Sequence, residues 1–173
     1  NFVAATSNQI VVGAFLDDDQ GGEAGAIYVY DANNLSATPT KLAPSGLDAG
    51  DRFGRSVAAT SNQIVVGAIW DDDQGSYAGA VYVYDANNLS ATPTKLTPSG
   101  IGQDDQFGVS VTATSNHIAV GASLDDDQGK NAGAVYVYDA NNLSATPTKL
   151  TPSGLGANDA FGYSVAANSN QIV

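Results

Sequence analysis

The sequence contains no cysteine and no methionine, and it has a single histidine among 173 residues. The lack of cysteine excludes a disulfide-stabilised scaffold, a thiol nucleophile and a cysteine-ligated zinc site. A single histidine also excludes histidine metal clusters and most general-base arrangements. Basic residues are scarce, because six Lys and Arg stand against 18 Asp and Glu, for a net charge of −12. This charge has the wrong sign for binding a nucleic-acid backbone or an anionic membrane.

No apolar run approaches the roughly 18–20 residues of a membrane-spanning helix, so we expect no membrane insertion. No charged segment followed by an apolar segment opens the chain. The sequence starts at Asn1, and both of its ends fall inside patterned segments, which we interpret as a processed chain or a piece of a longer one.

Glutamate is also rare, since Glu23 is the one acidic residue that is not Asp. Aspartate favours turns and hard-cation sites over helices, so we expect a β protein with acidic turns.

The chain consists of repeated copies of one segment. Residues 55–108 and 109–162 align without a gap, and 42 of the 54 positions are identical. Residues 1–54 form another copy that departs in its first two positions, and residues 163–173 begin a fourth copy. The spacing between copies, called the period below, exceeds that of helical repeats and is close to that of β-propeller blades, which have four strands each. We therefore expect one continuous array of three blades with a short overhang.

Four strands are predicted within the second copy, at residues 53–60, 63–68, 79–85 and 92–97. The second segment is a continuous apolar run, as in a strand covered on both faces. The third alternates Val with Tyr, as in a strand with two different faces. The last contains Pro and Lys, which guard a sheet edge against pairing with other chains. The recurring lysines in this role are Lys41, Lys95 and Lys149. The sequence thus predicts an all-β fold of four-stranded antiparallel blades, each running from an inner to an outer strand.

Several motifs recur in a fixed order. In the second copy they are Phe53-Gly54, the run Ile64 to Ala68 that ends in Gly-Ala, the triplet Asp71 to Asp73, and the strand Gly79 to Tyr84. In this order they resemble the FG-GAP repeat of integrin α-chain β-propellers, in its bacterial-type variant. The chain departs from that pattern because its first copy lacks Phe-Gly and no copy has the Pro of Gly-Ala-Pro. The residues in place of this proline are Phe15, Ile69 and Ser123.

An aspartate triplet follows the second predicted strand of every copy. Three carboxylates in one turn repel one another unless water or a cation neutralises them, and calcium loops use carboxylates at alternating positions. The alternating pairs are Asp17 and Asp19, Asp71 and Asp73, and Asp125 and Asp127, with Asp18, Asp72 and Asp126 between them. We predict calcium as the cofactor of these exposed loops, as the resemblance also implies, although later acidic positions of a calcium loop are missing. The alternative is a solvated turn whose carboxylates accept backbone N–H bonds.

A further aspartate stands two residues before each Phe-Gly. These residues are Asp51, Asp105 and Asp159. They either add cation ligands from the adjacent loop or accept backbone N–H bonds that fix the turn into the inner strand.

Each copy also carries an N-glycosylation sequon before its outer strand. The candidate acceptors are Asn34, Asn88 and Asn142. The three matches count as one observation, because the segment was copied. The Ser/Thr/Pro-rich stretch that follows is equally suited to O-linked sugars, and the remaining alternative is that none of these residues is modified.

Near-identical copies argue against an enzyme, which needs different groups around one reacting atom. A multivalent carbohydrate-binding propeller suits identical sites, but the aromatic loop residues Trp70 and Tyr77 occur in one copy only. Trp70 takes the place of a leucine in the other copies, so we interpret it as a packing residue. We predict an extracellular or cell-surface structural repeat of an adhesive protein, with carbohydrate binding as the alternative. Glycans and cell-surface proteins are its possible partners.

Assembly follows from the number of blades, because a closed propeller normally has four or more. Residues 163–173 are equivalent to residues 1–11, so one end can occupy the place of the other in a continuous array. We therefore expect the chain to continue into further repeats or to self-associate head to tail as a ring or filament. The alternative is that the overhang only marks a truncation. Within the blades, we expect Phe53, Phe107 and Phe161 to be buried.

Overall fold

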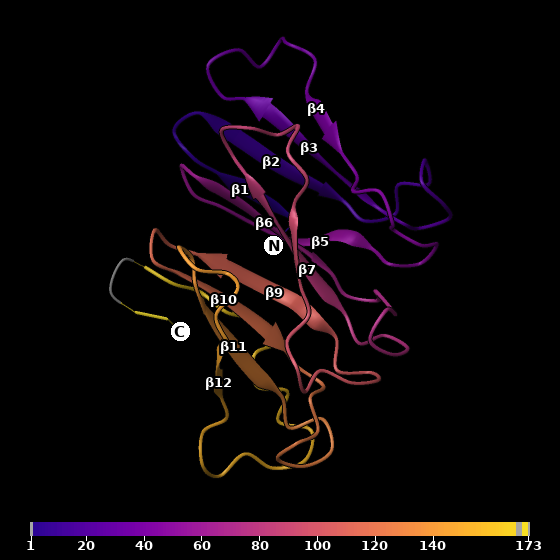
Figure 1. Ribbon diagram of the computed structural model, residues 1–173, viewed down its shortest axis with the longest axis vertical. Coiled ribbons are helices and arrows are strands. Elements are labelled where there is room, and N and C mark those ends of the chain that lie inside the picture. Colours follow the sequence, from indigo (N-terminus) through magenta and orange to yellow (C-terminus); the bar gives the residue numbers. More distant parts are fainter. Residues whose placement is uncertain (1, 169–170, 173) are drawn as a thin grey trace.

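The computed structural model of the chain describes residues 2–168 and 171–172. These residues form twelve β-strands, arranged as three sheets of four antiparallel strands each. This part of the chain contains no helix long and apolar enough to cross a membrane. The all-β fold of four-stranded blades is therefore confirmed. In Figure 1 the three sheets follow one another in chain order along the long axis of the molecule.

Each blade runs in chain order from an inner to an outer strand. The first blade consists of β1 (Val3–Ala5), β2 (Gln9–Ala14), β3 (Ala26–Asp31) and β4 (Thr40–Leu42). The second consists of β5 (Phe53–Ala59), β6 (Gln63–Ala68), β7 (Ala80–Asp85) and β8 (Thr94–Leu96). The third consists of β9 (Phe107–Ala113), β10 (His117–Ala122), β11 (Ala134–Asp139) and β12 (Thr148–Leu150). The strands predicted for the second copy are all present, and only their ends differ.

The register gives every blade two unlike faces. In the second blade Val66 pairs with Tyr82, which pairs in turn with Lys95 of the outer strand. Side chains alternate across a sheet, so one face, called the tyrosine face, carries Ile64, Val66, Tyr82 and Tyr84. The opposite valine face carries Val65, Val81, Val83 and Leu96. The equivalent positions, one period earlier or later, define these faces in the other blades.

The hydrophobic core lies between the blades. The valine face of the first blade, with Val11, Ile27 and Val29, forms one buried cluster with the tyrosine face of the second. The valine face of the second blade forms an equivalent cluster with the tyrosine face of the third. Because each blade buries its apolar side chains against its neighbour, stability depends on stacking, as in other repeat proteins.

The Phe-Gly doublets of the second blade, the third blade and the overhang each contact the Gly-Ala doublets of the preceding blade, an arrangement called the Phe-Gly lock below. Phe53 forms a bridge to Gly25, and its N–H donates to the Ala24 carbonyl at 2.9 Å. A side chain at Gly25 would run into the Phe53 carbonyl, and one at Gly13 would run into the Gly54 carbonyl. These glycines are therefore required by close backbone approach. The same contacts recur one period and two periods further along the chain.

Two of the three phenylalanines are buried as predicted. Phe53 and Phe107 are both fully buried, and each packs edge-on against two tyrosines of its own blade. Phe161 is only half-buried, so the prediction was wrong there. The reason is that Phe161 leads into the fourth copy, which contributes no tyrosine strand to cover it within this chain.

The overhang lies against the valine face of the third blade. Val165 is buried beside Ala119 and Val135, with Ile172 packed against them. The Ser110 hydroxyl donates to the Gly162 carbonyl at 2.8 Å, as the Ser56 hydroxyl does to the Gly108 carbonyl at 2.7 Å. The overhang thus starts where the inner strand of a fourth blade would start.

Candidate functional site

The aspartate triplets occupy the predicted position, in the loops between the second and third strand of each blade. Their predicted exposure is only partly correct. The second and third aspartates are exposed, but Asp71 and Asp125 are 2% and 1% exposed. Asp17, the equivalent residue of the first blade, is 16% exposed in its side chain. The first carboxylate of each triplet therefore needs a partner that compensates its burial.

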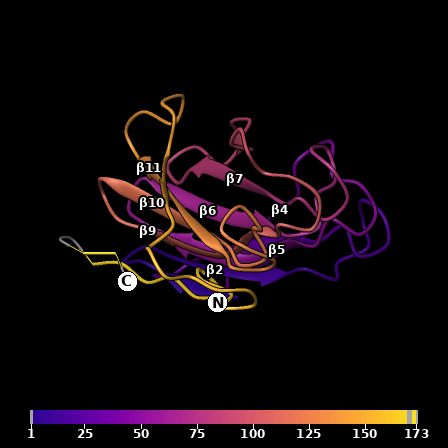
Figure 2. The same cartoon turned by 90° about the horizontal axis from the view of Figure 1, so that it is seen from below.

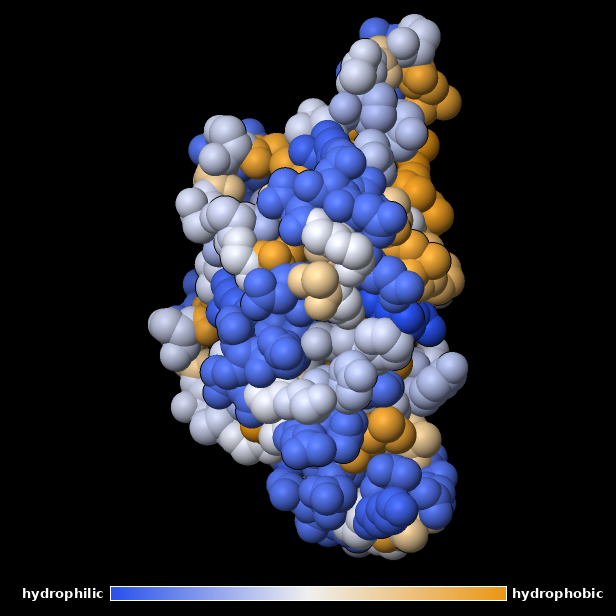
Figure 3. Space-filling model, turned by 90° about the vertical axis from the view of Figure 1, so that its right-hand side faces the viewer, coloured by the Kyte–Doolittle hydropathy of each residue, from blue (hydrophilic) through white to orange (hydrophobic). Residues whose placement is uncertain are grey.

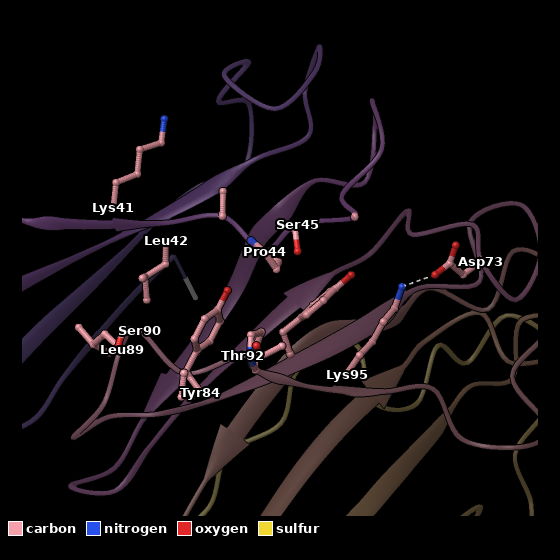
Figure 4. Close-up of a pocket in the computed structure, with 15 residues that line it drawn as sticks. Lys41, Leu42, Pro44, Ser45, Asp73, Tyr84, Leu89, Ser90, Thr92 and Lys95 are labelled. Carbon is pink, nitrogen blue, oxygen red and sulfur yellow. Dashed lines mark hydrogen bonds and ion pairs between the residues drawn. The ribbon is translucent and has the colours of Figure 1, made fainter.

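That partner is a lysine of the outer strand. The Lys95 Nζ atom lies 2.6 Å from Asp71 Oδ2 and 2.6 Å from Asp73 Oδ2, and Figure 4 shows its contact with Asp73. The Tyr82 hydroxyl donates to Asp71 Oδ2 at 3.0 Å, and the ammonium lies 5.3 Å from the centre of the Tyr82 ring. Each loop therefore already contains one cation, supplied by the chain itself.

The same arrangement is present in every blade. Lys41 Nζ lies 2.7 Å from Asp17 and 2.5 Å from Asp19, and Lys149 Nζ lies 2.6 Å from both Asp125 and Asp127. These lysines lie on the outer strand of each sheet, as predicted, and the ion pairs give them a second role that was not predicted. In the second blade Lys95 pairs with Tyr82, the first tyrosine of the Tyr-x-Tyr pair, and this register directs the lysine side chain toward the aspartate loop. The constant spacing between aspartate and lysine in every copy was the sequence signal for this contact.

The ion pairs change how these groups titrate. The hydrogen bond from Lys41 holds the pKa of the Asp17 carboxyl below its usual value. Burial alone lowers the pKa of Lys95, but its hydrogen bonds to Asp71 and Asp73 outweigh burial and raise that pKa above the usual value. Burial also raises the pKa of Tyr136 to about 12. The pKa values of Lys41 and Lys149 are also raised above the usual value, so all three lysines are charged at neutral pH.

The aspartates before the Phe-Gly doublets fix turns. The Asp51 carboxylate accepts the N–H of Asp48 at 2.9 Å, and Asp105 and Asp159 accept those of Gly102 and Gly156, both at 2.7 Å. This confirms the turn interpretation of their side chains. Asp51 and Asp105 are also buried, and burial raises the pKa of each to about 6, whereas Asp159 is exposed.

Three exposed acidic side chains come together at the first blade junction. One carboxylate oxygen each of Asp48, Asp72 and Asp73 lies within 4.8 Å of the others. Within the described ranges, this is the one such group of acidic, histidine or cysteine side chains. Gly102 and Gly156 replace Asp48 in the later copies, so the group is not repeated.

The sequons lie in exposed loops between the third and fourth strands, which project from one side of the molecule at the upper edge of Figure 2. In each loop the sequon serine donates a hydrogen bond of 2.8 Å to the asparagine side chain. The pairs are Ser36 with Asn34, Ser90 with Asn88, and Ser144 with Asn142. All three asparagines are exposed, as a glycosylation acceptor must be. Modification itself stays a prediction.

One interaction at the first blade junction was not foreseen. The Arg52 guanidinium lies 3.3 Å from the centre of the Trp70 ring and 2.7 Å from the Glu23 carboxylate. Tyr77 packs edge-on against the Trp70 ring, with ring centres 5.1 Å apart. Each of these four residues differs from its counterparts in the other copies, so the repeat pattern gave no signal for the group. The packing role assigned to Trp70 agrees with this geometry.

Comparison with known proteins identifies a family but no individual relative. No curated protein matches the chain with significance. The FG-GAP repeat, by contrast, matches three segments, residues 1–30, 38–84 and 92–138. The second and third segments each begin before the outer strand of one blade and end in the third strand of the next, so they span a Phe-Gly lock. These segments cover well over half of the sequence, and the chain therefore belongs to the FG-GAP repeat family.

Proposed function

We propose that the chain is a structural and adhesive repeat module of an extracellular or cell-surface protein, and that its blades build an array by stacking face on face. The family supports an adhesive or structural role, because FG-GAP repeats are typical of extracellular proteins and their propellers are generally not enzymes. The repeated junction supports the array. Valine and tyrosine faces meet twice in the same way, with the same residue types.

The tyrosine face of the first blade carries this proposal. Tyr82 and Tyr84 are buried by the preceding blade, but their equivalents Tyr28 and Tyr30 are only half-buried. Ile10 and Val12 on the same face are also half-buried, whereas their equivalents in the second blade are fully covered. The two junctions within the chain support one partner for such a face. It is the valine face of another blade of this sequence.

Polar contacts support the same partner. The Gln9 side chain donates to the Ala86 carbonyl of the next blade at 2.9 Å, and the Gln63 side chain donates to Ala140 at 2.8 Å. Ala32 holds the equivalent position in the first blade, where an incoming blade would supply the glutamine. Figure 3 shows a mostly hydrophilic surface whose hydrophobic residues gather along one margin of the upper part, which the first blade occupies. Phe2, Val3 and Leu16 are exposed hydrophobic residues of this blade.

The oligomeric state of the chain tests the array. We expect the molar mass measured by light scattering to rise with concentration, and Tyr30→Asp to reduce association because it puts a charge into the contact. Removal of residues 163–173 should strengthen association by freeing the valine face of the third blade. Ser76→Asp is the control, because it adds the same charge at an exposed position in the loop between β6 and β7 of the second blade. A chain that stays monomeric at every concentration, with or without the overhang, would contradict the proposal.

Calcium binding stays part of the proposal as a prediction. Alternating carboxylates and the exposed group of Asp48, Asp72 and Asp73 support it. At Asp71 and Asp73, however, a calcium ion competes with the Lys95 ammonium. We therefore expect calcium to raise Tm slightly in the native chain and more strongly in Lys95→Met, since a ligand that binds only the folded state stabilises it. An unchanged Tm of both proteins on adding calcium or a chelator would remove the metal from the proposed function.

A further inference from the structure

A groove opens at each junction between consecutive blades, on the side of the outer strands. The first groove has a volume of about 490 Å³ and lies between residues 41–46 of the first blade and residues 89–93 of the second. Its lining includes Leu42, Pro44, Ser45, Tyr84, Ser90 and Thr92, drawn in Figure 4. The second junction has a groove of about 250 Å³ lined by equivalent positions one period later. The groove is thus a product of the junction.

Each groove has a tyrosine in its inner wall whose hydroxyl is buried without a hydrogen-bond partner among the described residues. These are Tyr84 and Tyr138, both 3% exposed. The neighbouring Tyr82 and Tyr136, in contrast, donate to aspartates. Figure 4 shows the Tyr84 hydroxyl pointing toward the segment of Pro44 and Ser45 on the opposite wall. Buried side-chain hydroxyls nearly always bond to protein, water or ligand, so an oxygen from outside the chain is expected here.

The charges around the first groove are already paired. Lys95 is held by Asp71 and Asp73, and Lys41 is held by Asp17 and Asp19. An anion would therefore find no free cation, and a cation would find no free carboxylate among the lining residues. A purely apolar ligand would leave the Tyr84 hydroxyl unbonded, at a cost in free energy.

The remaining lining is neutral and of two kinds. Ser45 and Thr92 offer hydroxyls, which both donate and accept hydrogen bonds, and Ser90, whose hydroxyl already donates to Asn88, offers an acceptor, while Leu42 and Pro44 offer apolar surface. A ligand that matches both has neutral hydroxyls on one edge and C–H groups on a face. That is the chemistry of a neutral sugar ring.

We propose that the inter-blade groove binds a neutral saccharide unit, with a sugar oxygen hydrogen-bonded to the hydroxyl of Tyr84 at the first junction and of Tyr138 at the second. The first groove falls within the usual range of small-molecule sites, about 300–1,000 Å³, and the second lies below it, so the first binds more tightly. Thr97 replaces Ala43 of the first groove and adds atoms to the second. Two sites in one chain act together on a branched or repeating glycan. This binding goes beyond the structural role and does not depend on association of chains.

The test is an NMR titration of the isotope-labelled full chain with the methyl glycosides of glucose, mannose and galactose and with maltose, cellobiose and lactose. We expect shifts at the amides of Ser45 and Thr92, followed at higher concentration by their equivalents Ser99 and Thr146. Tyr84→Phe should weaken binding in the first groove about tenfold, which corresponds to about 1.4 kcal/mol, and leave the second unchanged. Tyr77→Phe is the control, because Tyr77 is 46% exposed and lines neither groove.

Stability in the absence of sugar provides the second measurement. Because Tyr84→Phe removes an unbonded hydroxyl, we expect Tm to stay the same or rise, so the variant stays folded. A lower Tm would show that water already satisfies the hydroxyl in the free protein, and would overturn the proposal. Shifts outside the grooves, no shifts with any of these sugars, or equal affinity of Tyr84→Phe and the native chain would also overturn it. The molar-mass measurement reports separately on the array.

Discussion

The ammonium of Lys95 lies 2.6 Å from the carboxylate of Asp71, a side chain that is 2% exposed. This contact joins the outer strand of the second blade to the loop between its two middle strands. An unpaired buried carboxylate is costly, and removing one member of a buried ion pair leaves such a charge behind. The lysine therefore both neutralises the acidic loop and fixes the outer strand to it.

Lys95→Met should lower the free energy of unfolding by about 3 kcal/mol, the lower end of the range for breaking a buried pair, because Lys95 itself is 27% exposed. Lys41→Met is the matched control in the first blade. Its loss should be about 1 kcal/mol, since Asp17 is more exposed than Asp71 and exposed pairs contribute little. Urea unfolding followed by circular dichroism measures both values. Equal losses in the two variants would show that burial of the aspartate is unimportant.

Gly67→Ala should destabilise the junction between the second and third blades. A Cβ atom at Gly67 would run into the carbonyl of Gly108, which is backbone and cannot move aside without shifting the strand. We expect a loss of about 1–3 kcal/mol, as for overpacking in a core, measured as a lower urea midpoint. Gly22→Ala is the control, because a Cβ there meets nothing within 4 Å. A Gly67→Ala protein as stable as the control would contradict the Phe-Gly lock.

Phe107→Ala should cost about 3–5 kcal/mol, the usual range for a buried phenylalanine, because Phe107 is fully buried against Tyr136 and Tyr138. Phe161→Ala makes the same chemical change at an equivalent but half-buried position, and we expect a clearly smaller loss. Thermal and urea unfolding provide the comparison. A loss under about 1 kcal/mol for Phe107→Ala would mean that the doublet does not anchor the core.

Stability should rise as the pH falls from 7 to about 4. Burial raises the pKa of Asp51 and Asp105 to about 6, above the value of 3.8 expected for the unfolded chain. Between these values the folded state binds more protons, so the stabilisation is complete below the unfolded pKa and is lost as the pH rises through 6. The gain is about 1–3 kcal/mol for each carboxyl. Asp17 has a lowered pKa, so its contribution is lost at still lower pH.

The double variant Asp51→Asn/Asp105→Asn separates this effect from the general repulsion at a net charge of −12. Asparagine has the same shape and still accepts the backbone N–H bond, but it does not titrate. We expect the unfolding free energy of the variant to change much less between pH 7 and pH 4. A profile as steep as that of the native chain would assign the pH dependence to other carboxylates.

Strand positions were predictable because the information is local. The alternation of Val and Tyr in residues 79–85 and the apolar run of residues 63–68 mark strands without reference to the rest of the chain, and the repeat period gives the number of blades. The burial of Asp71 was not predictable in this way. It depends on Lys95, which reaches the loop only because the outer strand pairs in one register.

The grooves were hidden from the sequence for a similar reason. Their walls come from two copies, and a residue such as Ser45 has no local pattern that places it opposite Tyr84. The difference between Phe107 and Phe161 likewise depends on which tyrosines follow in the chain, not on the doublet itself. Repetition therefore predicts the unit of structure well, but it does not show which equivalent residues are covered.

The Phe-Gly lock also bears on how such a chain can evolve. Because the Phe-Gly of one blade fits the Gly-Ala doublets of the blade before it, any window one period long carries one Phe-Gly doublet and one set of the glycines that such a doublet contacts, wherever the window starts. Unequal recombination between copies that are identical at 42 of 54 positions can therefore add or delete a whole period at almost any breakpoint. Each product keeps a valine face against a tyrosine face at every junction between blades. The number of blades can thus change by whole periods without altering the residues of any Phe-Gly lock.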